Sequence, residues 1–499
     1  MNKMKRYKTL FLITELVLFV PLIIFFLGWL KLPIAVIACV VTAAGGICAY
    51  QSVEYKEIQY DAKYILITAG VLTVWLIFSG IGRFSYQNSD WMVRNAILRD
   101  LVDYDWPVIY DFTKGNNLYS QYLPDQRAGL IYYFTFWLPA ALAGKLGGGG
   151  WNAANLLLFV WAFVFLLLTI FWLNVFIGRK SFCTLFVLIF FSGLDIIGAV
   201  LMNGVYTLQP AIHIEWWAGL IQYSSNTTQL YWVFNQCLPC WLITAVMLNV
   251  KKPWVTAFIA CTLFPYAPFC MFGMVPAALY FIFMLMKKEN KKIFVQEILN
   301  VIKSPAVPFA AVLLITFGSF FLSANSSISI RGFIWKYWEN IPAGAATYIS
   351  FLVLEFGIYA LLLYKTEKKN SLYWFAVLEL TIIPLYKMTP ANDFCMRASI
   401  VPLFILMALV IKNACDRLNK KDVCSVLLVA ALCIGAVTPM HEMVRSVENT
   451  VTMSPEQYLN EDIYSIGEPR TELGAEICGN QFYAENFNNF FYKHLSRKS

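Results

Sequence analysis

Residues 156–170 read LLLFVWAFVFLLLTI, and they lie within a stretch from 151 to 177 that holds no charged residue. About 20 consecutive apolar residues are enough to cross a bilayer as a helix. The stretch is followed by a basic pair, Arg179 and Lys180. Apolar runs of this kind, separated by short basic or polar segments, recur from one end of the chain to the other. The sequence therefore predicts an all-α bundle of membrane-spanning helices.

The composition excludes an ordinary water-soluble enzyme. Of the 499 residues, 59% are hydrophobic and only 14% are charged, whereas soluble domains carry about 25% charged residues. Thirteen crossings of about 20 residues each would use roughly half of the chain. The other half is too long for the loops of a bare pore, so we expect structure built outside the membrane between the spans.

We expect thirteen crossings and one ambiguous apolar run. The crossings lie at roughly residues 10–30, 33–50, 64–82, 151–177, 182–201, 229–249, 254–265, 267–286, 305–323, 346–364, 371–388, 398–412 and 423–439. The first lacks an A-x-A cleavage site and is typical of an uncleaved anchor. Prolines interrupt the pair 254–265 and 267–286, which predicts short, tightly turned helices. The ambiguous run, 129–143, would turn every later basic loop outward if it crossed, so we interpret it as re-entrant or interfacial.

The charge distribution predicts the orientation. The chain has a formal net charge of +8, and its Lys and Arg residues gather between apolar runs, above all in 287–303, 365–369 and 412–421. Cytoplasmic loops of membrane proteins are enriched in Lys and Arg. We therefore expect the N-terminus in the cytoplasm and the C-terminus outside it. The same distribution argues against a nucleic-acid partner.

Three parts follow from this layout. Residues 1–63 hold two spans and a cytoplasmic loop, and residues 64–440 form the transmembrane core. Residues 441–499 form an extracytoplasmic tail that we expect to dock on the membrane part. The largest external segment of the core is the loop 83–128, and it is where we expect the interfacial helices.

The first external loop carries the strongest candidate for chemistry. It opens with QNSDWMVRNAILRDL, residues 87–101, in which Ser89 or Asp90 is a suitable helix N-cap. The following residues alternate with helical spacing, which predicts an amphipathic helix that lies in the interface and ends near Pro107. Asp90, close to the end of the third span, is our candidate catalytic base, and Arg94 is a candidate substrate contact. The alternative is a solvated, folded loop.

Two further external segments hold candidate substrate contacts. His213 and Glu215 stand beside two tryptophans, whose flat faces suit sugar rings, although the alternative is an interfacial aromatic belt. The turn NDFCMR, residues 392–397, contributes Asp393 and Arg397. Arg397 at the start of a span suits an anionic headgroup through paired hydrogen bonds. The alternative is an ion pair between Asp393 and Arg397 that closes the turn.

Other polar groups lie within the expected spans. Four of them are acidic: Glu15, Asp195, Glu355 and Glu379. A charge at the bilayer centre costs about 2.5–3.5 kcal/mol on insertion scales, so such a residue usually has a partner or a function. We favour local structural pairing over an ion path. Cys237-Leu-Pro-Cys240 has redox spacing but lies inside a span without βαβ context, so we interpret it as structural.

These features resemble the polytopic GT-C glycosyltransferases, the superfamily of lipid-phospho-sugar-dependent mannosyl- and arabinosyltransferases. The resemblance covers roughly residues 64–440. It rests on the many spans, the early acid and membrane-lying helix of QNSDWMVRNAILRDL, and the loop exit GLIYYFTFWLP, residues 129–139. The turn NDFCMR is similar to that of uncharacterised bacterial membrane proteins. The chain departs from the family in having Trp91 after Asp90 where a second acid is common, and in two extra spans before the loop.

The resemblance implies a GT-C-like fold and transfer of a sugar from a polyprenyl-phosphate donor to an external acceptor, namely a glycan, a lipid or a protein. Asp90 would take the proton of the acceptor hydroxyl, and Arg397 would stabilise the departing phosphate. We expect a bacterial cell membrane location, contact with membrane lipid and no resident cofactor, with a divalent metal left open. A transporter or flippase of lipid-linked saccharides is the alternative, and a non-catalytic assembly subunit is a third.

Overall fold

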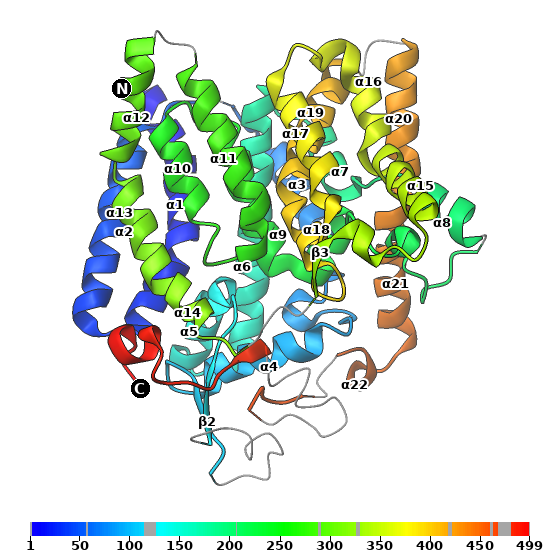
Figure 1. Ribbon diagram of the computed structural model, residues 1–499. Coiled ribbons are helices and arrows are strands. Elements are labelled where there is room, and N and C mark those ends of the chain that lie inside the picture. Colours follow the sequence, from blue (N-terminus) through cyan, green and yellow to red (C-terminus); the bar gives the residue numbers. More distant parts are fainter. Residues whose placement is uncertain are drawn as a thin grey trace.

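The computed structural model (Figure 1) describes residues 2–55, 58–113, 126–205, 207–287, 291–325, 330–417, 422–459, 463–467 and 481–498. Over these residues the chain forms one bundle of helices whose connecting segments gather mainly at its two ends. One end, here called the basic end, holds the start of the chain and the Lys-rich beginning of α12 (Lys291–Ile302). The opposite end, here called the sheet end, holds a small sheet and the last described residues.

The elements follow one another as a nearly continuous series of helices. The helices besides α12 are α1 (Asn2–Trp29), α2 (Leu32–Ser52), α3 (Ala62–Ile77), α4 (Trp91–Asp103), α5 (Leu138–Leu146), α6 (Gly150–Ile177), α7 (Phe182–Phe190), α8 (Asp195–Asn203), α9 (Asn226–Met247), α10 (Pro253–Cys261), α11 (Met271–Met286), α13 (Ala306–Leu313), α14 (Ser319–Leu322), α15 (Ile341–Leu352), α16 (Ile358–Glu367), α17 (Ser371–Ile382), α18 (Asp393–Ala398), α19 (Ile400–Arg417), α20 (Val423–Gly435), α21 (Val437–Thr452) and α22 (Pro455–Tyr458).

Five short strands complete the fold of the described residues. They are β1 (Ile109–Asp111), β2 (Arg127–Leu130), β3 (Arg331–Phe333), β4 (Tyr386–Met388) and β5 (Tyr483–Ala484). The order β1-β2-β5 forms an antiparallel sheet in which Gly129 is opposite both Ile109 and Ala484. Strand β3 pairs with β4, with Gly332 opposite Lys387. The first sheet thereby ties the C-terminal tail to the segment that connects α4 with α5.

Nine segments of the described chain are long and apolar enough to cross a membrane. They are Thr9–Trp29, Leu32–Ser52, Gly150–Ile177, Phe182–Asn203, Asn226–Met247, Pro268–Met286, Ile341–Glu367, Asp393–Asp416 and Val423–Thr452. A tenth results if Phe294–Ile302 and Ala306–Leu322, bent by 46° at their junction, are one span. These segments confirm an all-α, multi-pass integral membrane protein.

The other expected crossings correspond to shorter helices. The crossings at 64–82 and 371–388 match the apolar helices Ala62–Ile77 and Ser371–Leu385, which fall short of the length of a span. The crossing at 254–265 matches α10, which has only 9 residues. Thirteen crossings therefore stay a prediction.

The ambiguous run 129–143 enters and leaves the bundle at the sheet end (Figure 1). It begins in β2 and continues through α5 to the start of α6. Between these, the Thr135 hydroxyl donates to the Pro265 carbonyl at 2.8 Å. Pro265 belongs to the turn between α10 and α11, where the Tyr266 hydroxyl donates to the Leu18 carbonyl, near the middle of α1, at 2.6 Å. The two segments thus meet inside the bundle, which agrees with the re-entrant interpretation of the run.

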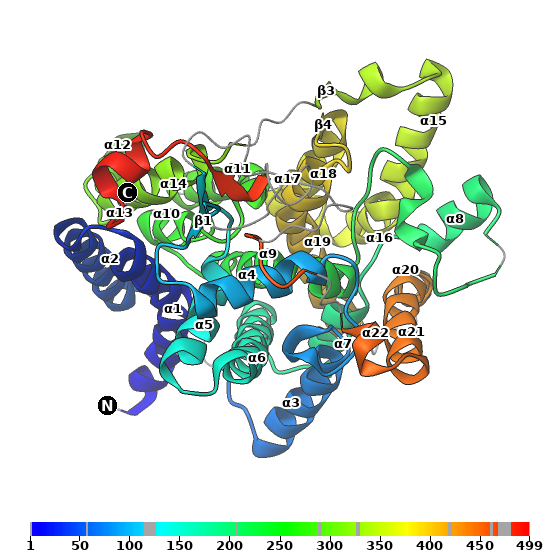
Figure 2. The same cartoon turned by 90° about the horizontal axis from the view of Figure 1, so that it is seen from below.

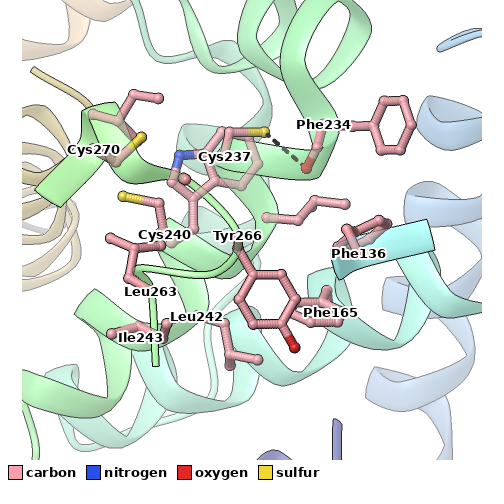
Figure 3. Close-up of a cluster of buried hydrophobic side chains, with 14 of the residues drawn as sticks. Phe136, Phe165, Phe234, Cys237, Cys240, Leu242, Ile243, Leu263, Tyr266 and Cys270 are labelled. Atoms are coloured by element: carbon pink, nitrogen blue, oxygen red, sulfur yellow. Dashed lines mark hydrogen bonds between the residues drawn. The ribbon is translucent and has the colours of Figure 1, made fainter. Parts of the chain in front are cut away.

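Buried side chains fill the place where these segments meet (Figure 3). The Phe136 ring lies 5.7 Å from the Phe234 ring. Cys237, Cys240 and Cys270 belong to the same fully buried cluster and are free thiols. The Cys237 thiol lies 3.9 Å from the Phe234 carbonyl oxygen. The CxxC pair is thus part of the apolar core, in keeping with its structural interpretation.

Two of the four acids within the expected spans have protein partners. Asp195 accepts hydrogen bonds from two hydroxyl groups, at 2.6 and 3.1 Å. Glu355 accepts one from an indole N–H at 3.0 Å. One buried oxygen of Asp195, one of Glu355, one of Glu15 and both of Glu379 have no hydrogen-bond partner in the described part of the chain. Local pairing therefore accounts for Asp195 and Glu355 only in part, and for the other two not at all.

Helix α4 matches the predicted amphipathic helix, but it is more deeply embedded than predicted. Its apolar stripe is buried, and so are its polar residues Arg94, Asn95 and Asp100. Seen from the sheet end (Figure 2), α4 lies near the centre of the molecule, among α5, α6 and α9. Because the tail also covers this helix, α4 belongs to the protein interior rather than lying free on a membrane surface.

The C-terminal tail docks across the sheet end, as predicted. Asp100 on α4 accepts hydrogen bonds from the Tyr110 hydroxyl at 2.5 Å and from the Ile466 backbone N–H at 2.9 Å. Further along, the Lys31 N–H donates to the Leu495 carbonyl at 2.8 Å. Residues 114–125 of the expected loop 83–128, and residues 468–480 of the tail, lie outside the described residues.

The last span extends beyond the predicted crossing 423–439. Helices α20 and α21 together form the segment Val423–Thr452. Residues 441–452, which we assigned to the tail, are therefore helical. As a result, Glu442 and Arg445 lie buried inside the protein.

Candidate functional site

Asp90 and Arg94 form an ion pair at the start of α4. Arg94 donates from Nη2 to Oδ2 of Asp90 at 2.8 Å. Asp90 occupies the N-cap position, as one of the two predicted caps, but its side chain accepts no hydrogen bond from a backbone N–H of the helix. The carboxylate of Asp90 is paired with Arg94, one helical turn away. The Asn88 side chain accepts a hydrogen bond from the Asp90 N–H at 3.1 Å. The Asp90 side chain is 44% exposed, and its Oδ1 accepts no hydrogen bond from the described residues.

Arg94 lies between aromatic rings. Its guanidinium carbon is 5.7 Å from the ring centroids of both Trp91 and Phe234, and these two rings stack 5.2 Å apart. The side chain is only 6% exposed, and its buried Nη1 has no hydrogen-bond partner within the described ranges. Leaving such a donor unpaired is costly. Arg94 therefore keeps one donor that the described protein does not use, beside the carboxylate of Asp90.

The turn after α17 presents a second ion pair. Arg397 lies 3.4 Å from Asp393, whose other oxygen accepts from the Thr389 hydroxyl at 2.6 Å. Asn392, at a left-handed φ of 57°, caps α18 through its side chain and donates to the Leu220 carbonyl at 2.9 Å. The expected ion pair is thus present. Because its contact is long, Arg397 keeps donors for a further partner.

Three distant segments bring six side chains together. This set, here called the ion-pair cluster, consists of Asp90, Arg94, Tyr132, Tyr133, Asp393 and Arg397. The negative charge of Asp90 acts on Arg397, and the charges of Arg397, Asp393 and Arg94 all act on the Tyr133 phenol. The rings of Tyr132 and Tyr133 stack with centroids 3.9 Å apart. The re-entrant run thus supplies the two tyrosines that join one ion pair to the other.

The ion-pair cluster holds two cations, two anions and two phenols. Burial raises the pKa of the Tyr133 phenol and, more strongly, that of Tyr132, so both remain neutral donors near pH 7. The side chains of Arg397 and Asp393 are 15% and 33% exposed. The cluster is therefore accessible. It can bind an anion through guanidinium and phenol donors and can take up a proton on Asp90.

His213 lies in a separate polar group formed with α21. Its ring stacks on Trp216 with centroids 4.1 Å apart, and its Nδ1 is 3.2 Å from Nη1 of Arg445. Arg445 is in turn paired with Glu442 at 3.0 Å. Burial, together with the charges of Arg445 and His441, lowers the pKa of His213 to about 4. The imidazole is therefore neutral near pH 7.

Glu215 forms hydrogen bonds within its own loop. Its two oxygens accept hydrogen bonds from the Ser225 N–H and from the Gln222 amide, both at 2.8 Å. Burial, with the nearby charges of Asp195 and Glu442, raises its pKa to about 8. These bonds fix the loop that packs against the 392–397 turn. A substrate contact of Glu215 stays a prediction.

Sequence reasoning missed three functional candidates. Tyr132 and Tyr133 were quoted only as part of the loop exit, and Arg445 was placed in the tail. One sequence signal is that these two adjacent tyrosines lie in the run 129–143, which is interpreted as re-entrant. The spacing His441, Glu442 and Arg445, which puts a histidine and an arginine on one helix face, was another.

Within the described ranges, no group of three or more His, Cys, Asp or Glu side chains is placed to hold a metal ion. Comparisons of the chain with protein-family models, with curated proteins and with solved structures find no match. A functional assignment therefore rests on the geometry of the ion-pair cluster, and the likeness to GT-C enzymes stays a resemblance.

Proposed function

We propose that the protein is a membrane glycosyltransferase, which moves a sugar from a polyprenyl-phosphate-linked donor to an extracytoplasmic glycan, glycolipid or protein acceptor. One observation carries the proposal: the partly exposed carboxylate of Asp90 stands within electrostatic reach of Arg397, which comes from the other half of the chain. Transfer from a lipid phosphate needs a proton acceptor and a cation together. The ion-pair cluster supplies both.

The donor phosphate would bind to the arginines of the cluster. Arg397 is held only by a 3.4 Å contact to Asp393, and Arg94 has the unpaired Nη1. Guanidinium groups bind phosphate oxygens through paired hydrogen bonds. The neutral phenol of Tyr133 adds a donor between them. The polyprenyl chain would lie against the apolar helices beside the cluster.

In the proposed step, Oδ1 of Asp90 takes the proton of the acceptor hydroxyl while the acceptor oxygen bonds to the anomeric carbon of the donor sugar. The bond from that carbon to the phosphate oxygen breaks, and its electron pair leaves with the lipid phosphate. Arg397 and Arg94 stabilise the added negative charge. A positioned base of this kind contributes about 10²–10⁴ in rate.

The proposed orientation places the ion-pair cluster outside the cytoplasm. The Lys-rich start of α12 and the N-terminus share the basic end, and α4 lies at the sheet end (Figure 1). Basic loops face the cytoplasm in most membrane proteins. The sheet end would therefore face the outside, where a lipid-linked sugar meets its acceptor in a bacterial envelope.

A flippase of lipid-linked saccharides is a second candidate because of one observation. The turn between α10 and α11 meets the re-entrant run inside the bundle, and transporters often build binding sites from broken helices. The meeting place is filled with buried aromatic and cysteine side chains (Figure 3). We rank glycosyl transfer first for this reason.

Donor binding gives a test of the proposal that is independent of turnover. Purified protein in nanodiscs should bind polyprenyl phosphate, and Arg397→Lys should weaken that binding about tenfold because the two-pronged contact is lost. Arg331→Lys, a matched change of an exposed arginine, should leave binding unchanged. Equal binding by the wild type and Arg397→Lys would contradict the phosphate site.

A further inference from the structure

A cavity of about 540 Å³, lined by polar and aromatic side chains, has Ser89 in its wall, the residue before Asp90 of the ion-pair cluster. Its lining includes Tyr86, Ser89, Gln209, Trp232, Arg445 and Asn449. A recess of about 10 Å³ continues beneath Tyr86 and Trp232 toward Asn88. The main volume is within the range of small-molecule sites.

The charged groups around this cavity compensate one another. Arg445 is fixed by Glu442 at 3.0 Å and donates to the carbonyls of Pro210 and Ile212 at 2.6 and 2.8 Å. Its charge therefore faces a carboxylate and two carbonyl oxygens of its own chain. His213, with a pKa near 4, carries no charge near pH 7. The cavity offers no uncompensated charge to an ionic ligand among its described lining.

The remaining lining combines hydrogen-bonding groups with aromatic faces. Gln209 and Asn449 bring amides, and Ser89 brings a hydroxyl. Trp232 and Tyr86 bring ring surfaces. Amides and hydroxyls pair with ligand hydroxyl groups as donors and acceptors. Flat aromatic faces suit the apolar side of a sugar ring.

We propose that this cavity binds a neutral, hydroxyl-rich saccharide unit, and that this unit is the end of the acceptor. Saccharide binding is inferred from the cavity lining alone, whereas the identity of the saccharide as the acceptor rests on the proposed glycosyl transfer. Ser89 lines the cavity, and the next residue, Asp90, belongs to the ion-pair cluster. Adjacent Cα atoms are about 3.8 Å apart. The proposed base therefore comes from the residue next to the cavity wall.

Helix α9 also borders both the cavity and the ion-pair cluster. Trp232 lines the cavity, while Phe234, two residues later, packs against Arg94 and Trp91 of the cluster side. The helical backbone is broken between them at Val233, with φ −146° and ψ 39°. One short segment thus forms a wall of both the donor site and the acceptor site.

The test uses neutral methyl glycosides and methyl glucuronide as probes in saturation-transfer NMR. The full chain is held in lipid nanodiscs, because maltoside detergents would compete for the cavity. Wild-type protein should bind a neutral glycoside and prefer it to the glucuronide. Gln209→Ala should weaken binding about fivefold, the size of one neutral hydrogen bond, and Trp232→Leu about tenfold through loss of the ring face. The matched control is Asn488→Ala, which also removes an exposed side-chain amide but lies in the tail; it should leave glycoside binding unchanged.

The outcomes separate this inference from the proposed function. Absence of glycoside binding, preference for the glucuronide, or unchanged binding by both variants would overturn the saccharide site. Binding by Trp232→Leu is compared with the wild type only if the two proteins have equal thermal stability. If Trp232→Leu is unstable, the result for Gln209→Ala decides, because Gln209 is at an exposed position. If the glycosides bind as expected but no donor supports transfer, the cavity stands and glycosyl transfer fails. If transfer occurs, both variants should raise the acceptor KM and leave polyprenyl phosphate binding unchanged.

Discussion

Replacement of Asp90 by Asn is the most informative single change at the ion-pair cluster. Asn has nearly the same shape, but it cannot take a proton from an acceptor hydroxyl. Its amide oxygen can still accept the 2.8 Å hydrogen bond from Arg94. Because Asp90 does not cap α4 through its side chain, the change removes no helix cap. It removes the charge of the ion pair and the proposed base together.

The two losses differ in size. The Asp90 side chain is 44% exposed but Arg94 is only 6% exposed, so solvent screens one side of the ion pair, and removing its charge while the Asn amide keeps the hydrogen bond should cost about 1–2 kcal/mol of folding free energy. Loss of a general base should lower the rate about 10²–10⁴-fold, which corresponds to about 3–5 kcal/mol of transition-state stabilisation. The variant should therefore fold and insert normally, bind polyprenyl phosphate, and transfer at least about 100-fold more slowly.

The assay follows release of label from a polyprenyl-phospho-sugar by wild type, Asp90→Asn and Asp103→Asn in nanodiscs. Asp103 is an exposed carboxylate at the other end of the same helix, so its replacement controls for a loss of charge on α4. We expect Asp103→Asn to keep near-wild-type turnover. Near-wild-type turnover by Asp90→Asn would refute the assignment of the base and direct attention to Asp105 or Glu215.

Three further predictions concern the turn, the topology and the tail. If Arg397 only closes the turn, combining Asp393→Asn with Arg397→Gln should restore activity lost in the single variants; we expect no rescue in transfer assays. In a background without accessible native cysteines, Glu456→Cys should react with an impermeant thiol reagent from outside intact cells and Lys369→Cys should not, and the reverse pattern would invert the orientation. Burial raises the pKa of Asp100 from 3.8 to about 7, so its protonated form favours the docked tail, and this contribution should be lost as pH rises from about 4 to 7. The protection factor for hydrogen exchange at residues 463–467, which corrects for the intrinsic pH dependence of exchange, should therefore be higher at pH 5 than at pH 8, and Asp100→Asn should remove that difference.

The features that the sequence predicts well are local. The uncharged stretch 151–177 corresponds to Gly150–Ile177, because length and apolar content alone decide whether a helix can span a membrane. The amphipathic spacing after Asp90 predicts α4, and Pro107 limits its end. Prolines similarly explain why α10 has only 9 residues. In each case the deciding residues lie within the element or a few residues beyond its end.

The ion-pair cluster could not be predicted as a unit, because its residues come from three segments that only the folded bundle brings together. The spacing of Asp90 and Arg94 allows an ion pair on one helix face, yet from the sequence we consider Asp90 only as one of two possible N-caps and as a catalytic base. The proximity of Asp90 to Arg397 depends on how the re-entrant run and α18 pack beside α4. Helical periodicity carries no information on that packing.

The polar group around His213 was only half predicted for a related reason. His213 stood out as one of three histidines, but its partner Arg445 follows the last expected span and reads as part of a polar tail. In the structure α21 continues α20 as far as Thr452. A helix with a charged, buried face is recognisable only once its neighbours are known.

The most direct test of the proposed function is a transfer assay in sealed vesicles that contain only this protein. A polyprenyl-phospho-sugar with label in the sugar is supplied in the membrane, and a hydroxyl-bearing saccharide acceptor is added on the side that the sheet end faces. We predict that the label becomes covalently bound to the acceptor, that sugar-free polyprenyl phosphate appears in equal amount, and that Asp90→Asn abolishes both. Movement of the intact labelled lipid between leaflets without any new glycosidic bond would contradict glycosyl transfer and identify a carrier.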